Sequence, residues 1–241
     1  MRGQRGKVAF FFRRADAFFV SLALLLLFSC GLPTSDYLYP PADFSSPSGS
    51  LVRLEHETAN IREVGELFKG YDIYYRIFDT YDDALNSYNF LNNNLRSSDI
   101  AQIESTRGYY VLAKYDNTNN PDDNVPLIPV SDDNTYRSFD LHLYSDETWT
   151  ITADDNEIVL YYIFRNKSGM DTADFCSRSQ YLEGDPDYED EGDGISDNVD
   201  DSVYIVFFAV AYGISSSSIG SELYSDPIVL EPIQYTPTEG S

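Results

Sequence analysis

Few side chains in this 241-residue chain are of the types that usually carry chemistry. Nucleophilic catalysis needs a nucleophile beside a base, and the chain offers two cysteines and two histidines. Cys176 follows Phe175, a context typical of a small buried residue. His56 and His142 lie in strand-like alternating patterns that place both side chains toward solvent. From these residues we predict no catalytic site, no metal site and no cofactor.

The densest group of carboxylates lies between Asp185 and Asp201. Counted from Glu189, the segment matches the third, fifth, sixth, ninth and twelfth positions of a calcium-binding loop with Glu191, Asp193, Gly194, Asp197 and Asp200. The first position is Glu where Asp is favoured, the last is Asp where Glu is expected, and no helical pattern flanks the loop. A solvated connection between strands is the favoured interpretation, and Ca²⁺ binding is the alternative.

The other thiol, Cys30, ends a pattern typical of an export signal. Residues 1–29 begin with a positive region, formed by Arg2, Arg5, Lys7, Arg13 and Arg14. An apolar run from Ala17 to Phe28 follows, and its dozen residues are fewer than the roughly 20 that a membrane-spanning helix needs. We therefore expect residues 1–29 to be removed as a signal peptide.

The string Leu27-Phe28-Ser29-Cys30 resembles the lipobox of bacterial lipoproteins, in the loosened form that spirochaetal lipoproteins tolerate. The resemblance implies that Cys30 becomes the first mature residue and carries acyl chains that hold the protein on a membrane. It also implies a place in the cell envelope, at the outer membrane or the periplasmic face, with the cell surface as the alternative. The alternatives are an ordinary secretory signal, an N-terminal membrane anchor, or a twin-arginine signal at Arg13-Arg14.

The mature chain is strongly acidic. Without residues 1–29 it retains 11 basic and 39 acidic side chains, a formal charge of −28. Such a surface repels nucleic acid, so we expect no nucleic-acid partner. Aromatic residues make up 15% of the chain and recur in alternating clusters, which argues for a folded core rather than acidic disorder.

Residues 31–48 are rich in proline and serine, which predicts an extended tether between the lipid and the folded part. Counted as 18 extended residues, the tether would reach about 60 Å. Residues 49–241 are long enough to bury one core, and we assign them to a single domain.

Period-two patterns dominate that domain, and Tyr71 to Ile77 is the clearest half-buried strand. The other predicted strands are Leu51 to Glu55, Tyr109 to Tyr115, Tyr136 to Tyr144, Trp149 to Thr152, Ile158 to Phe164, Val203 to Tyr212 and Pro227 to Ile233. Turn residues separate them and no helices alternate with them. The predicted fold is therefore a mainly β, two-layer antiparallel sandwich.

Two stretches resemble fibronectin type III modules. Tyr71, Ile73, Tyr75 and Arg76 match the Tyr-x-Val-x-Tyr-Arg strand of that family. An aromatic strand from Val203 to Tyr212, a Gly and Ser loop, and Ser225-Asp226-Pro227 follow in the order found near the end of such modules. The resemblance implies a fibronectin III or immunoglobulin-like sandwich.

Between about residues 80 and 108 the period changes to three or four, with Leu85, Tyr88, Leu91 and Leu95 on one face. We predict a helical insertion, divided near Ser97-Ser98-Asp99, whose apolar face packs on the sheet; a binding face is the alternative.

The 20 tyrosines exceed the need of one core, and tyrosine is favoured at binding surfaces. The adjacent pairs Tyr109-Tyr110 and Tyr161-Tyr162 should each place one ring outward. The leading hypothesis is a lipid-anchored binding or scaffold module for an envelope protein or glycan. A polysaccharide hydrolase using carboxylates and a purely structural surface lipoprotein are the alternatives.

Overall fold

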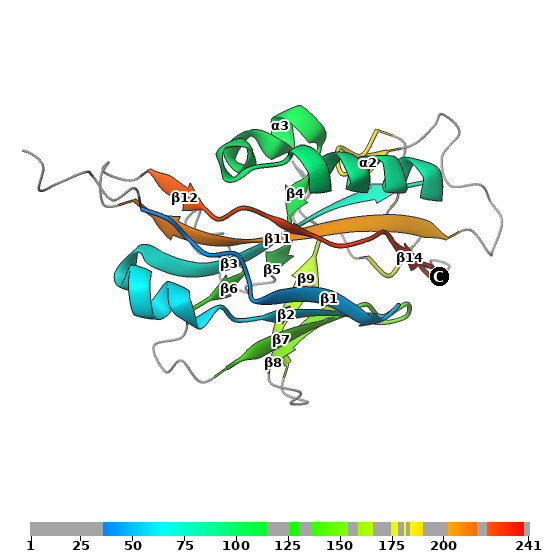
Figure 1. Ribbon diagram of the computed structural model, residues 1–241. Helices are drawn as coiled ribbons and strands as arrows, with labels where there is room; N and C mark the ends of the chain where they lie inside the picture. Colours follow the sequence, from blue (N-terminus) through cyan, green and yellow to red (C-terminus); the bar gives the residue numbers. More distant parts are fainter. Residues whose placement is uncertain are drawn as a thin grey trace, which may run out of the picture. The chain divides into compact units, whose positions relative to one another are not determined.

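The computed structural model describes residues 36–114, 126–130, 136–153, 159–165, 175–177, 181, 184–189, 202–215 and 221–238. These residues are mainly β and form two sheets, with most of the helical residues on one side and the short helical segments η1 (Asn60–Val64) and η2 (Gly65–Leu67) elsewhere (Figure 1). Sheet A has the strand order β1 (Asp43–Ser48), β2 (Leu51–Glu55), β7 (Ser138–His142), β8 (Trp149–Ala153), β9 (Val159–Phe164) and β5 (Ala113–Lys114). The predicted mainly β fold of antiparallel sheets is confirmed.

Sheet B is built around two long neighbours, β3 (Phe68–Phe78) and β11 (Val203–Ile214), paired antiparallel over most of their length. Short strands flank β3, namely β4 (Tyr110–Val111), β6 (Ile128–Pro129) and β10 (Tyr188–Glu189). Others flank β11, namely β12 (Glu222–Tyr224), β13 (Ile228–Val229) and β14 (Ile233–Tyr235). The two-residue pair between β10 and β3 is parallel, unlike the antiparallel pairs of the rest of the sheet.

The predicted helical insertion is present as α2 (Tyr81–Asn94), a 3₁₀ turn η3 (Ser97–Gln102) and α3 (Ile103–Arg107). The chain divides where the sequence predicts. Asp99 supports the second piece, because its Oδ2 accepts a 3.0 Å hydrogen bond from the backbone N–H of Arg96. Thr80 caps α2 through its side-chain oxygen.

The apolar face of these helices packs on the outer face of sheet B, as Figure 1 shows. Leu91, Leu95 and Ile103 meet Val206 and Phe208 there in one buried cluster. A larger cluster fills the space between the two sheets, where Trp149 stacks on Phe175 with ring centroids 3.7 Å apart. Sheet B is therefore covered on both faces over much of its area, by helices on one side and by sheet A on the other.

This double cover corrects the prediction for Tyr109-Tyr110. The two rings point to opposite faces of sheet B as expected, but Tyr109 lies in the cluster beneath the helices and Tyr110 in the cluster between the sheets. Both are buried because both faces are covered. For Tyr161-Tyr162 the prediction is confirmed: Tyr161 packs against the core and Tyr162 is 52% exposed.

The predicted tether is also corrected, because its second half is part of the fold. Leu38 is fully buried, and β1 pairs with β2 from Asp43 onward. Phe44 alternates inward between two polar neighbours, which is the pattern of a half-buried strand inside a Pro- and Ser-rich segment. Pro47 is tolerated there because β1 is the edge of sheet A, with an irregular register nearby.

A buried ion pair connects the two sheets. Arg165 follows β9 of sheet A, and Asp187 precedes β10 of sheet B; both are almost fully buried. The guanidinium donates to both carboxylate oxygens of Asp187, at 2.8 Å from Nε and 2.5 Å from Nη2. Tyr75 Oη donates to the same carboxylate at 2.6 Å, so the buried charge is compensated by three hydrogen bonds.

Candidate functional site

Two of the sequence predictions lie outside the described residues. These are the lipidation site Cys30 and the calcium-loop positions from Glu191 to Asp200, and both remain predictions. Of the proposed loop, Glu189 is described, and its carboxylate pairs with Arg76 Nη2 at 2.7 Å.

Cys176 is buried, as predicted for a small apolar residue. Its Sγ lies against the backbone carbonyl oxygens of Glu147 and Tyr144. Carbonyl oxygens do not stabilise a thiolate, so these two contacts suit the small packed residue that the sequence predicts.

His56, predicted to face solvent, is instead half-buried at a seam between the sheets. Its ring lies beside Phe68 and Tyr71, whose strand belongs to sheet B, while its backbone N–H bonds to Arg137 of the chain leading into sheet A. The sequence gives no local signal for this, since the burial comes from residues far along the chain.

The hydroxyl of Tyr71 and the burial of the ring determine the surroundings of the His56 imidazole. The backbone N–H of Glu57 donates to Tyr71 Oη at 2.8 Å, and Tyr71 Oη lies 2.9 Å from His56 Nδ1. Burial raises the pKa of Tyr71 to about 12, so its hydroxyl keeps its proton near neutral pH. Burial also lowers the pKa of His56, against a smaller opposing effect of Glu57. The lowered pKa favours the neutral ring, whose Nε2 is buried and has no hydrogen-bond partner among the described residues.

His56 and Tyr71 line a cavity of about 20 Å³, which is room for about one water molecule. The other described lining residues are Ile128, Pro129, Val130, Tyr136 and Phe139. None of the described lining residues carries a carboxylate. We interpret the cavity as structural.

The outer face of sheet A offers a different kind of site, which we call the open face. It includes the outward residues Leu51, Arg53, Asp140, His142, Thr150, Thr152, Val159 and Tyr162, together with Tyr144, which stacks on His142. The alternation that places Trp149 and Ile151 in the core directs Thr150 and Thr152 to this side. Helices α2 and α3 do not pack on it, and Figure 1 shows them on the far side of sheet B.

Aromatic rings flank the centre of the open face. His142, Thr150 and Tyr162 are direct cross-strand partners on three adjacent strands, which spaces the outer two by about 10 Å. Tyr144 stacks on His142 with centroids 5.6 Å apart and ring planes within 5°. Tyr144 and Tyr162 are among the most exposed large apolar side chains of the described residues.

Polar groups accompany these rings. Arg53 donates two hydrogen bonds of 2.7 Å to the carboxylate of Asp140, which holds both side chains in a fixed fork. His142 Nε2 lies 3.0 Å from Thr152 Oγ1. The hydroxyl of Thr150, between the rings, is buried and has no partner among the described residues. Flat rings beside fixed polar groups are what a ligand with alternating apolar and hydroxyl surfaces requires.

Nowhere in the part of the chain that the structure describes do three His, Cys, Asp or Glu side chains gather closely enough to hold a metal ion. Within the same ranges, every helix is too short or too polar to traverse a lipid bilayer. Comparison with known proteins adds no relative, since no family model, no curated protein and no solved structure matches the chain.

Proposed function

We propose that this chain is a lipid-anchored binding module of a bacterial envelope, and that its open face holds the ligand. The observation that carries the binding role is the set of exposed rings of Tyr144 and Tyr162 around His142, on the sheet face that neither α2 nor α3 covers. The anchor is supported by the export pattern and by the string that ends at Cys30. The net charge of −28 predicted for residues 30–241 favours neutral or cationic partners over nucleic acid.

We also propose a fibronectin III-like relationship for the sandwich. The motif residues Tyr71, Ile73, Tyr75 and Arg76 lie on β3, and the aromatic stretch that accompanies them in the resemblance lies on its antiparallel neighbour β11. The two parts of the sequence resemblance thus lie on adjacent strands. This adjacency supports the proposed relationship of the sandwich to fibronectin type III modules.

The anchor is tested by expressing the full chain and its Cys30→Ala variant in a diderm bacterial host. The unchanged chain should incorporate labelled palmitate and sediment with membranes, whereas Cys30→Ala should do neither. Equal membrane partitioning of the two proteins would refute the anchor.

Binding is tested by applying the detergent-solubilised full chain to an array of neutral and charged envelope and host glycans. Tyr162→Ala and Tyr144→Ala should each lose most of the signal, because each removes an exposed ring. Phe90→Ala is the matched control, since Phe90 is an exposed ring on the helical layer. Equal loss in all three variants, or hydrolysis of a bound glycan, would contradict the proposal.

A further inference from the structure

The chain is fixed to the fold from Asp36 onward. Ser215 Oγ donates to Asp36 Oδ2 at 2.8 Å, and the side chain of Leu38 is fully buried. Tyr39 exchanges two hydrogen bonds with Asn60, at 2.8 Å to its amide oxygen and 2.7 Å from its amide nitrogen. Little slack therefore remains between Asp36 and the body of the domain.

This attachment shortens the predicted reach of the protein. Six residue steps separate Cys30 from Asp36, and in any conformation they span at most about 22 Å. The earlier expectation of about 60 Å assumed that residues 31–48 were all free. If Cys30 is acylated, the part of the domain around Asp36 must lie close to the bilayer surface.

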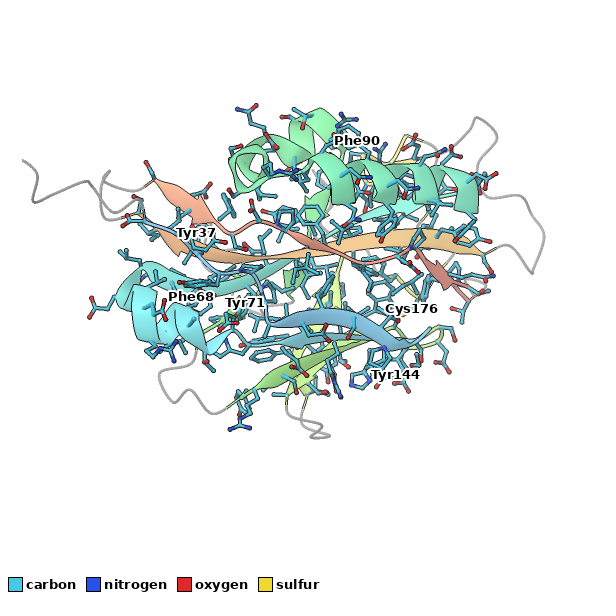
Figure 2. All side chains as sticks on the ribbon, in the orientation of Figure 1. Tyr37, Phe68, Tyr71, Phe90, Tyr144 and Cys176 are labelled. Atoms are coloured by element: carbon cyan, nitrogen blue, oxygen red, sulfur yellow. The ribbon has the colours of Figure 1, made fainter. Side chains whose placement is uncertain are left out.

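The direction of β11 shows which part of the domain points the other way. Its last residue, Ile214, precedes Ser215, which holds Asp36. Its first residue, Val203, pairs with Tyr235, whose hydroxyl donates to the backbone oxygen of Tyr144 at 2.9 Å. A strand of 12 residues is about 40 Å long. Figure 2 accordingly shows Tyr37 at one end of the domain and Tyr144 with Cys176 at the other.

The surface near Asp36, which we call the proximal end, comprises Asp36, Tyr37, Tyr39, Arg62, Glu63 and Ser215. Tyr37 is 52% exposed and contacts Tyr39 edge-to-face at 5.2 Å. The carboxylate of Glu63 accepts from Tyr39 Oη at 2.7 Å and from Arg62 at 2.8 Å, so its charge is locally compensated. Exposed tyrosine beside a compensated charge suits the boundary between headgroups and water.

We propose that the proximal end rests on the headgroups of the bilayer that holds the acyl chains of Cys30, with Tyr37 at headgroup depth. The end bearing Tyr144 then points away from the membrane. This orientation rests on the proposed lipid anchor, because the short covalent span from Cys30 is what brings Asp36 to the surface.

The test uses the full lipidated chain in phosphatidylcholine vesicles that contain a spin-labelled phosphatidylcholine as quencher. An environment-sensitive fluorophore is attached to Cys in the variants Tyr37→Cys and Tyr144→Cys, with Arg62→Cys as a second proximal position. The chain without an added Cys measures background labelling at the buried Cys176. Fluorophores at positions 37 and 62 should lose more than half of their emission, and the fluorophore at 144 should keep nearly all of it.

Vesicle-bound protein with an unquenched fluorophore at 37, or with equal quenching at 37 and 144, would overturn the orientation while leaving the anchor intact. If mass spectrometry finds an unmodified thiol at Cys30 and the protein stays in the supernatant, the anchor itself is wrong and the orientation falls with it. The two failures are therefore distinguishable in one experiment.

Discussion

The two sheets of this domain contain the same kinds of residues but differ in how their faces are covered. In sheet B, β3 and β11 are buried at nearly every position, because sheet A covers one face and the helical layer covers the other. In sheet A, β2 alternates between buried and partly exposed positions, whereas β8 at the centre of the sheet is buried at all five positions. Neither α2 nor α3 packs on the outer face of sheet A, and the rings of Tyr144 and Tyr162 are exposed there, so a ligand has access to part of this face.

The largest expected difference in stability is between variants of the two Arg–Asp ion pairs. Asp187→Ala should destabilise the protein by about 3–5 kcal/mol, because it leaves the guanidinium of Arg165 buried without its main partner. Asp140→Ala should cost about 1 kcal/mol, since the side chain of Arg53 on the open face keeps access to water. Urea unfolding of both variants measures the contrast, and equal losses would show that both pairs are equally enclosed.

Two leucine-to-alanine variants compare how strongly the outer faces of the two sheets are buried. Leu91→Ala removes an α2 side chain buried against sheet B and should cost about 2–5 kcal/mol. Leu51→Ala removes a partly exposed side chain opposite His142 in sheet A and should cost less than about 1 kcal/mol. Thermal unfolding followed by calorimetry measures both. Similar losses would mean that the outer face of sheet A is as enclosed as that of sheet B.

The stability of the helical layer can be tested at Thr80, the N-cap residue of α2. Thr80→Ala should cost about 1 kcal/mol, because the backbone N–H of Asp83 loses its acceptor at 3.2 Å. The exposed threonine Thr58 supplies the control variant Thr58→Ala, which should leave the urea midpoint nearly unchanged. The rate of amide hydrogen exchange within α2 should rise in Thr80→Ala alone. An unchanged rate would contradict the prediction that the Thr80 cap stabilises α2.

The smallest expected effect is a pH dependence at the seam between the sheets. Because the pKa of His56 is lowered in the folded state, the unfolded chain binds the proton more readily. Stability should therefore fall as the pH drops through about 6.5, the ordinary histidine value, and level off below the folded pKa. His56→Gln should flatten this part of the profile relative to His142→Gln. A profile unchanged by His56→Gln would contradict the lowered pKa.

The sequence predicts an element well when the pattern that marks it is local. The helical insertion was located because apolar residues such as Leu91 and Leu95 recur at helical spacing, and the long strands because their runs exceed five residues. β1 was missed because its proline and serines resemble a tether. β6, β10 and β12 were missed because two or three residues carry no period.

The site residues show the same division. Alternation alone predicted that one ring of Tyr161-Tyr162 is exposed, and the structure shows that it is Tyr162, next to the core residue Ile163. The burial of His56 and of both Tyr109 and Tyr110 did not follow, because distant segments cover them. The open face needed the register of three strands, which brings His142, Thr150 and Tyr162 into one row.

The segment from Tyr110 to Lys114 has a further consequence for how the protein unfolds. β4 belongs to sheet B and β5 to sheet A, and Leu112 alone joins them while its backbone N–H bonds to Ile73 of β3. One continuous backbone segment forms a strand in each sheet. Unfolding of either sheet therefore strains the hydrogen bonds that this segment makes in the other sheet. The domain should therefore lose its structure in a single cooperative transition rather than layer by layer.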